Sequence, residues 1–254
     1  MLLSYTQIGK NHIHFETMES TNDYAYDLVS KSNPLDGTVI STDFQTNGHG
    51  QFDRKWESSA GENILLTIIL YPGFLSVEKQ FFLSFSISLS IIDYLKGKNI
   101  DAKIKWPNDI YFDSKKIAGI LIKNTISSSM LSSSIVGIGL NLNQEFFSTN
   151  ENATSVKNIT IKSQVIKTEI QALLKCVEVE YNSLKNLNEQ SVIKKYERHL
   201  YYINESIQFE KDGTSTNLEI IGIDFYGRLI TRDKDGVIIK ITHGVGIIHY
   251  PPNK

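Results

Sequence analysis

The pattern of apolar residues changes near residue 202, and this change constrains the fold more than any other feature of the sequence. Before it, apolar residues recur at helical spacing over 78–96 and 164–187, with strand-length apolar runs between them. After it the helical period disappears, and short alternating stretches are separated by Asp-Gly and Tyr-Gly pairs typical of tight turns. The sequence therefore predicts an α+β domain over residues 1–202 and a small β-barrel over residues 203–254.

Apolar period and turn residues predict the individual elements. Ser20, Thr21 and Asn22 mark a capped helix start, and Gly97 is a candidate C-cap for the longest helix. The expected helices cover 23–32, 78–96, 164–187 and 191–202. The expected strands cover 37–42, 63–71, 103–106, 117–123, 135–142, 206–210, 218–224, 228–232, 237–242 and 246–250. Polar and turn-forming residues dominate three further segments, which are predicted as loops or turns: 46–62, 107–115 and 127–134.

Composition and charge are those of an ordinary globular protein. Of the 254 residues, 41% are hydrophobic and 21% are charged, and the formal net charge is -2. That charge gives no reason to expect a nucleic-acid partner, and no apolar run approaches membrane-spanning length. The single cysteine, Cys176, excludes an internal disulfide framework, and no signal peptide is recognisable, so we expect a cytoplasmic protein without a membrane partner.

The stretch from Lys105 to Asp109, with Lys116 and Gly119 downstream, carries the most chemistry. Its polar residues lie at the ends of predicted strands, and two lysines near one carboxylate suit an anionic ligand. A lysine can neutralise the negative charge that grows when a carboxylate attacks a phosphoryl group. Asp109 could hold such a lysine or help to bind magnesium. Equally, both lysines could be solvated surface residues, and Asp109 could only shape the turn.

The polar segment from Gly48 to Trp56 is the second candidate. Closely spaced glycines let backbone N–H groups approach an anion, as in phosphate nests. Arg54 and Lys55 add cationic donors, and the flat face of Trp56 could cover a purine ring. The segment lacks the third glycine and the helix of a dinucleotide fingerprint. The plainer alternative is a surface loop that Trp56 anchors to the core.

Two sets of small polar residues complete the candidates. Asn141 and Asn143 alternate with apolar residues, so on a strand they would share a face and could line a pocket. Alternatively, they could satisfy the backbone at a strand end. Ser20 and Thr21 could bind a neutral polar ligand, or they could serve only as a helix cap.

Taken together and in order, these segments resemble the biotin protein ligase family, the biotin–[acetyl-CoA-carboxylase] ligases. The motifs are Glu-Ser-Thr-Asn at 19–22, the Gly-x-Gly…Arg-Lys-Trp loop at 48–56, Lys-Trp-Pro-Asn-Asp at 105–109, Lys-Ile-Ala-Gly-Ile-Leu-Ile at 116–122 and Gly-Ile-Gly-Leu-Asn-Leu-Asn at 137–143. The resemblance implies a mixed sheet with flanking helices, like that of class II aminoacyl-tRNA synthetases, followed by an SH3-like β-barrel. It also implies that ATP and biotin are the substrates and that Mg²⁺ is the cofactor. Biotin would be activated as biotinyl-5′-AMP and then transferred to a lysine of a biotin carboxyl carrier protein.

Roles for individual residues follow from the same resemblance. The residues expected to hold biotin are Ser20, Thr21, Asn22 and Gln45, with the backbone near Gly119. Those expected to cover the biotin tail and the acyl phosphate are Gly48, His49, Gly50 and Gln51. The expected catalytic residues are Lys116, Asp109 and Arg54. Arg54 and Trp56 would serve the nucleotide, and Lys105 would support its phosphate end. Asn108, Asp109 and Asn141 would line the ATP and magnesium side, with no particular metal ligand assigned.

This chain departs from the family pattern at two places. The family loop usually reads Gly-Arg-Gly, whereas His49 and then Gln51 stand here, leaving less fixed positive charge over the adenylate. We therefore predict that His49→Arg slows the release of biotinyl-AMP. Near the C-terminus, Val245 stands where the family often has an acidic residue.

The resemblance also bears on partners. No helix-turn-helix or zinc pattern precedes the first motif, which favours a monofunctional ligase without a DNA-binding domain. Exposed sheet edges often dimerise in this family, so a homodimer is left open. The alternatives to a biotin ligase are a lipoate or octanoate ligase or transferase of the same fold, and a non-catalytic ligand-binding module.

Overall fold

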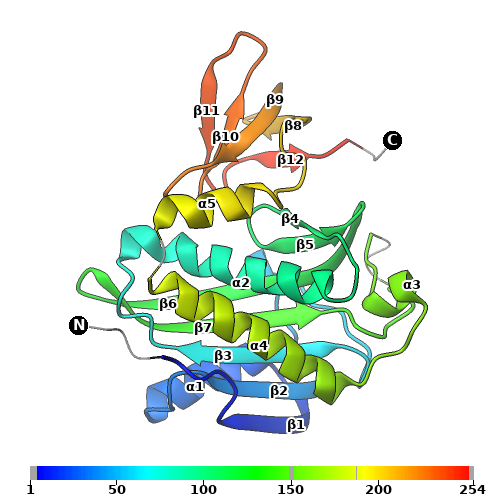
Figure 1. Ribbon diagram of the computed structural model, residues 1–254. Coiled ribbons are helices and arrows are strands. Elements are labelled where there is room, and N and C mark those ends of the chain that lie inside the picture. The colour runs from blue at the N-terminus through cyan, green and yellow to red at the C-terminus, as the bar shows by residue number, and fades with distance from the viewer. Residues whose placement is uncertain (1–4, 149–151, 187, 252–254) are drawn as a thin grey trace.

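A seven-stranded sheet forms the body of the molecule, and a five-stranded sheet lies at its C-terminal end (Figure 1). This computed structural model describes residues 5–148, 152–186 and 188–251. The elements of the larger part are β1 (His12–Met18), α1 (Thr21–Lys31), β2 (Thr38–Gln45), β3 (Ile64–Leu70), α2 (Gln80–Lys96), β4 (Lys103–Lys105), β5 (Asp109–Phe112), β6 (Lys115–Ser127), β7 (Met130–Leu140), α3 (Val156–Thr160), α4 (Ile166–Leu184) and α5 (Glu189–Glu197).

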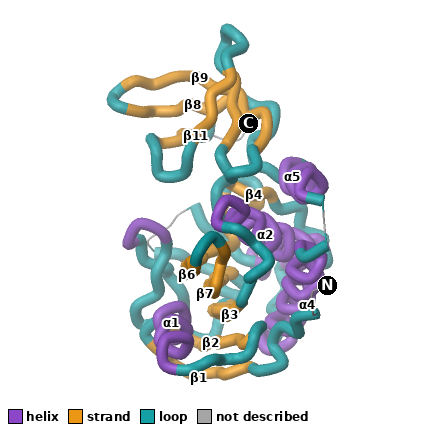
Figure 2. The backbone as a smooth tube through the Cα atoms, turned by 90° about the vertical axis from the view of Figure 1, so that its left-hand side faces the viewer, coloured by secondary structure: helices purple, strands orange, loops and turns teal. Residues whose placement is uncertain are grey.

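The larger sheet is mixed. Its strand order is β1-β2-β3-β7-β6-β5-β4. The edge strand β1 runs parallel to β2, and the other neighbouring pairs are antiparallel. Helices cover both faces: Figure 2 shows α1 on one side of the strands and the pair α2 and α4 on the other. This arrangement confirms the predicted α+β fold with a mixed sheet and flanking helices.

The helix α2 lies at the centre of the apolar core. It packs against α4, α5 and the sheet, and residues all round its surface are buried, as expected of a helix enclosed on several sides. On the opposite face of the sheet, Ala25 of α1 packs with Ile40, Ile69 and Ile135 in a separate, smaller apolar cluster. That smaller cluster fixes the start of α1 against the strands that build the site.

Several sequence predictions need correction. The segment 107–115 is not only a turn region, because β5 lies in it: Ile110, Tyr111 and Phe112 are good strand formers, and Asp109 pairs with Lys105. The turn predicted over 127–134 is only Ser128 and Ser129, because the long β6–β7 ladder reaches Ser127 and Met130. The strand β1 and the short helix α3 were not predicted. The last predicted helix ends at Glu197, not at residue 202.

All five strands predicted after residue 202 are present. They are β8 (Ser206–Lys211), β9 (Thr214–Ile223), β10 (Leu229–Arg232), β11 (Ile238–Ile241) and β12 (Ile247–His249). They form an antiparallel sheet in the order β11-β10-β9-β8-β12. The SH3-like barrel and the domain boundary at 202 and 203 stay predictions. Residues 1–4, 149–151, 187 and 252–254 of the predicted ranges lie outside the described residues.

The two sheets are joined by direct contacts. Ile207 and Leu229 of the smaller sheet belong to the same apolar cluster as α2, and the Trp106 indole N–H donates a 2.8 Å hydrogen bond to the Gly227 carbonyl. Within the described part of the chain, no helix is long and apolar enough to cross a membrane.

Candidate active site

A cavity of about 570 Å³ opens between the larger sheet, the loop after β2 and the C-terminal sheet. Segments far apart in sequence line it: the start of α1, the loop after β2, β5, β6, β7, residues 243–248 and Tyr250. Every residue to which the resemblance gave a role lines this cavity except Gly48. The carbonyl of Gly48 accepts a 3.0 Å hydrogen bond from the Trp56 N–H, so Gly48 forms the base of the loop. The predicted residues thus converge on one place in the fold.

Lys116 and Asp109 form an ion pair in the cavity, with 2.7 Å between Lys116 Nζ and Asp109 Oδ1. Asp109 pairs with Gly119 across β5 and β6, and a regular ladder would place Lys116 on the opposite face from Gly119. The register shifts by one residue after Ile110, so that Tyr111 pairs with Lys116. This β-bulge brings Lys116 onto the face that carries Asp109.

Trp56 lies flat against the sheet because two strands lack side chains beneath it. A Cβ atom on Gly139 would lie 2.5 Å from Trp56 Cε2, and one on Gly119 would lie 3.0 Å from Trp56 Cζ3. Lys116 Nζ is 5.4 Å from the centroid of the Trp56 ring, which is a favourable cation–π distance. Trp56 Nε1 is buried without a hydrogen-bond partner among the described residues. The indole therefore leaves a polar atom available within the site.

Lys105 is held by aromatic rings. Its ammonium donates to the Tyr111 hydroxyl at 3.2 Å and lies 4.3 Å from the Tyr111 ring centroid and 4.7 Å from that of Tyr250. Burial lowers the pKa of Lys105; the nearby carboxylate of Asp109 opposes this, whereas Lys116 and Arg54 add to it. Burial also raises the pKa of Tyr111 to about 12, so its hydroxyl keeps its proton. Lys105 is thus a partly buried cation close to the Lys116–Asp109 ion pair.

Cationic side chains outnumber carboxylates on the cavity wall. The cationic residues are Arg54, Lys55, Lys105 and Lys116, and the acidic residues are Asp109 and Glu57. A wall of this composition favours a ligand that carries several negative charges. Within residues 5–148, 152–186 and 188–251, no group of three or more His, Cys, Asp or Glu side chains is arranged to hold a metal ion.

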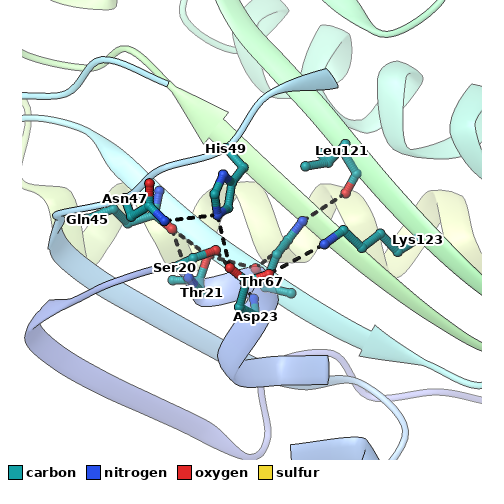
Figure 3. Close-up of polar contacts among 10 residues, drawn as sticks. Ser20, Thr21, Asp23, Gln45, Asn47, His49, Thr67, Leu121 and Lys123 are labelled. Atoms are coloured by element: carbon teal, nitrogen blue, oxygen red, sulfur yellow. Dashed lines mark hydrogen bonds and ion pairs between the residues drawn. The ribbon is translucent and has the colours of Figure 1, made fainter. Parts of the chain in front are cut away.

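The side chains that line the other end of the cavity, from Ser20 to Asn22 and Gln45, are polar and uncharged. Figure 3 shows their contacts, together with Asp23 and Lys123, which do not line the cavity. Gln45 Oε1 accepts from the Thr21 backbone N–H at 2.8 Å and from the Thr21 hydroxyl at 3.0 Å. The Thr67 hydroxyl lies 2.6 Å from Asn22 Oδ1 and 2.8 Å from Thr21 Oγ1. Ser20 also caps α1, accepting from the Asp23 N–H, so the helix-cap interpretation is confirmed. The network holds these amides and hydroxyls in fixed directions.

Asn22 reaches the cavity across Gly137, a second position on β7 that has no side chain. A Cβ atom on Gly137 would lie 2.4 Å from Asn22 Oδ1, so only glycine leaves room for this amide. Asn22 Nδ2 donates a longer bond, 3.4 Å, to the Leu121 carbonyl. Gly137 and Gly139 therefore seat Asn22 and Trp56 side by side on one strand.

The sequence predicts that the two asparagines after β7 share a strand face, but they lie beyond the end of the strand. The strand ends at Leu140. Beyond it, Asn141 Nδ2 donates to the Thr154 carbonyl at 3.0 Å, while Asn143 Nδ2 donates to the Gln164 carbonyl at 2.9 Å. The alternative that they satisfy local backbone is confirmed, although Asn141 also lines the cavity. Asn108 similarly donates to a backbone carbonyl, that of Ile120, at 2.7 Å.

The sequence did not point to three parts of the site. Thr67 supports the polar end, and the only signal for it was one hydroxyl within the apolar run of β3. The C-terminal segment 243–248 and Tyr250 line the cavity, and a second Gly-x-Gly at Gly244 and Gly246 was the available signal. The Phe52 ring, at the tip of the loop, lies 5.3 Å from that of His243.

The fold and the cavity together define an α+β enzyme scaffold with a polar, uncharged end and a cationic end. A family model described as the biotin/lipoate A/B protein ligase family matches residues 14–141, and the chain belongs to that family. The chain is therefore a ligase of this class.

Individual relatives extend the similarity beyond the matched residues. The bifunctional ligase/repressor BirA of Bacillus subtilis is 28% identical over 244 residues, which cover 93% of this chain and 71% of that protein. The biotin–[acetyl-CoA-carboxylase] ligase of Mycobacterium tuberculosis is 24% identical over 238 residues, covering 91% of this chain and 85% of that protein. The structure of the Aquifex aeolicus biotin protein ligase in complex with biotin and ATP superposes with a TM-score of 0.80 and 26% identity. That superposition covers 95% of this chain and 100% of that chain.

Proposed function

We propose that this protein is an ATP-dependent biotin ligase that forms biotinyl-5′-AMP and transfers the biotinyl group to a lysine of a biotin carboxyl carrier protein. One observation carries the proposal. The Lys116–Asp109 pair and the cationic wall lie in the same cavity as the neutral polar network of Thr21, Gln45 and Asn22. A neutral ureido ring suits the polar end, and an acyl phosphate suits the cationic end.

In the first half-reaction the biotin carboxylate attacks the α-phosphorus of ATP, and pyrophosphate leaves. Negative charge grows on the phosphoryl oxygens, and Lys116 stabilises it, held in place by Asp109 at 2.7 Å. Arg54 and Lys105 add positive charge on the same side. Trp56 supplies a flat apolar surface for the adenine. Gly50 and Gln51 cover the acyl phosphate.

In the second half-reaction the acceptor lysine of the carrier attacks the acyl carbon of the mixed anhydride. An amide forms, AMP leaves, and the lysine gives up a proton. The carrier must present its lysine to the cavity, which is also lined by residues 243–248, from the turn before β12 and the start of that strand. We propose residues 1–202 as the catalytic unit and residues 203–254 as the smaller unit that completes this wall.

Magnesium fits the site as a companion of the ATP phosphates. Mg²⁺ keeps several waters and needs only one or two protein carboxylates in addition to phosphate oxygens. Glu57 and the second oxygen of Asp109, whose Oδ1 is paired with Lys116, are the carboxylate groups that line the cavity and would hold it. When bound, the ion would neutralise charge on the leaving pyrophosphate. A homodimer remains a prediction.

One assay tests the function against its nearest rivals. The protein is incubated with ATP, Mg²⁺, a biotin carrier domain and either biotin or lipoate, and the mass of the carrier is measured. We expect a mass gain that depends on biotin and not on lipoate. A gain with lipoate alone would identify a lipoate ligase instead, and no gain with either acid would indicate a non-catalytic binding module.

A further inference from the structure

The glycine loop, residues 48–55, is connected to α1 by a contact between His49, which lines the cavity, and Asp23, which does not. His49 Nε2 is 3.0 Å from Asp23 Oδ2 (Figure 3). Asp23 lies in the first turn of α1, next to Thr21 and Asn22, and its backbone N–H donates to the Ser20 hydroxyl. The carboxylate therefore stands on the same helical turn as the polar end of the cavity.

The other polar contacts of the loop do not make this connection. The Gly50 N–H donates to the Arg54 carbonyl at 2.6 Å and the Trp56 N–H donates to the Gly48 carbonyl at 3.0 Å, so these bonds shape the loop from within. The loop's base is fixed by the backbone N–H of Asn47, which donates to the Glu19 carbonyl at 2.9 Å. Among the contacts of the described residues, the His49 side chain thus provides the polar link from the loop itself to α1.

The geometry shows how the imidazole makes this contact. The Asp23 carboxylate can only accept, so His49 Nε2 must carry the hydrogen. Asn47 Nδ2 lies 3.4 Å from the same nitrogen and, as a donor, could bond only to a bare Nε2. The two contacts are therefore alternatives, and the shorter, charge-assisted one is to Asp23. The other carboxylate oxygen of Asp23 lies 3.4 Å from Lys123 Nζ.

We propose that Asp23 is a positioning residue which, through His49, holds the glycine loop over the cavity and so retains the adenylate between the two half-reactions. This inference rests on the proposed function. It assigns the retention to a pair that this chain builds with a histidine, where the resemblance alone left the role of position 49 open. Loss of the pair should speed escape of the adenylate while leaving its formation nearly unchanged.

The experiment separates these two rates. Protein loaded with biotin, ATP and Mg²⁺ is freed of excess reactants, and release of biotinyl-AMP is followed over time; adenylate formation is followed separately by the pyrophosphate burst. We expect Asp23→Ala to release the adenylate about two- to fivefold faster, the upper part of the range for one exposed ion pair. The pyrophosphate burst should stay within about twofold of the parent rate, because Asp23 does not touch the reacting atoms.

A double-variant cycle distinguishes this role from a structural one. Asp23 also stabilises the N-terminus of α1 through the helix dipole, and that contribution would persist in a His49→Ala background. The proposed contact would already be absent in that background. The double variant Asp23→Ala with His49→Ala should therefore release biotinyl-AMP no faster than either single variant. His49→Arg should slow release only while Asp23 is present. Lys123→Ala is the matched control, because it removes the other partner of the same carboxylate without touching the loop.

Each outcome decides the question. Release at the parent rate from Asp23→Ala, or additive effects in the double variant, would overturn the inference. Asp23→Asn, which keeps the shape of the side chain, replaces Asp23→Ala if that variant fails to fold. If the parent protein forms no adenylate from biotin and ATP, the proposed function fails instead, which is a separate result.

Discussion

At the scale of single residues, the proposed chemistry depends on Lys116, whose side chain is held in place by its neighbours. Asp109 fixes the ammonium of Lys116, and the Trp56 ring lies 5.4 Å from it. Both members of the ion pair are roughly three-quarters shielded, with side-chain exposures of 22% and 26%. A shielded cation is less screened by water and is more effective towards a developing charge.

Lys116→Ala should reduce carrier biotinylation about a hundredfold or more, the usual cost of removing one preorganised donor to a transition state. Lys115→Ala is the matched control, because Lys115 is an exposed neighbour on the same strand and does not line the cavity. Carrier mass gain measured over time gives the rate for each variant. Near-normal activity of Lys116→Ala would refute the assigned role.

Gly139→Ala should displace Trp56, since the added Cβ would lie 2.5 Å from the indole. We expect a raised KM for ATP together with a loss of about 1–3 kcal/mol in the free energy of unfolding, typical of overpacking. Tryptophan fluorescence and ATP-dependent kinetics provide the measurements. Gly73→Ala is the control, because a Cβ atom there meets nothing within 4 Å. An unchanged KM in Gly139→Ala would contradict the role of Trp56.

Much of the residue-level site could be predicted, because short motifs preserve the order of chemical groups along the chain. Lys116, Asp109 and Arg54 lie in one cavity, as expected. Thr67 and Tyr250 could not be found in the same way. A hydroxyl within an apolar strand has no local signature of its partners, and Tyr250 approaches Lys105 only through long-range folding.

At the scale of elements, the β-bulge of β5 and β6 decides the site. Without the register shift after Ile110, Lys116 would point away from Asp109. The sequence indicated an apolar strand there but not its pairing, since a bulge depends on which residues of the partner strand lie opposite. The same limit explains why local sequence predicts a turn where β5 lies: its four residues pair with β4 and β6, and this pairing is set by the fold.

The start of α1 couples a helix cap to the polar end of the cavity. Ser20→Ala removes the side-chain acceptor of the Asp23 N–H and should lower the free energy of unfolding by about 1 kcal/mol. It should also weaken biotin binding, because Ser20 lines the cavity. Urea unfolding and calorimetric titration with biotin measure the two effects.

A second capping serine serves as the control. Ser155 accepts from the Asn158 N–H at the start of α3 and does not line the cavity. Ser155→Ala should therefore cost similar stability without changing biotin affinity. Equal biotin affinities for the parent and Ser20→Ala would show that Ser20 is only a cap.

At the scale of the whole molecule, the cavity belongs to both sheets. The strands after residue 202 were predictable from alternation and turn pairs, which are local signals. Their approach to the cavity was not, because it depends on contacts such as the hydrogen bond from Trp106 to Gly227, which spans 121 residues of sequence. Local periodicity therefore predicts the fold class, whereas the closure of the site depends on how the two sheets pack.

Trp106→Phe tests that packing. The variant keeps an aromatic ring but removes the 2.8 Å bond to the Gly227 carbonyl, at an expected cost of about 1 kcal/mol. Amide hydrogen exchange should then rise in the C-terminal sheet more than in the larger sheet. Tyr226→Phe, in the same turn but with an exposed ring, provides the control. A uniform rise across both sheets would contradict a local connection.

The bare positions on β7 also limit how this chain can change by mutation. Gly137 and Gly139 leave room for Asn22 and Trp56, so a larger residue at either glycine collides before any compensating change elsewhere can arise. In the reverse order, a smaller residue replaces Asn22 or Trp56 first, and a side chain that lines the cavity is lost. Either route passes through an impaired intermediate. A saturation library scored for biotinylation should therefore show paired intolerance at these four positions, with tolerated combinations found only among double substitutions.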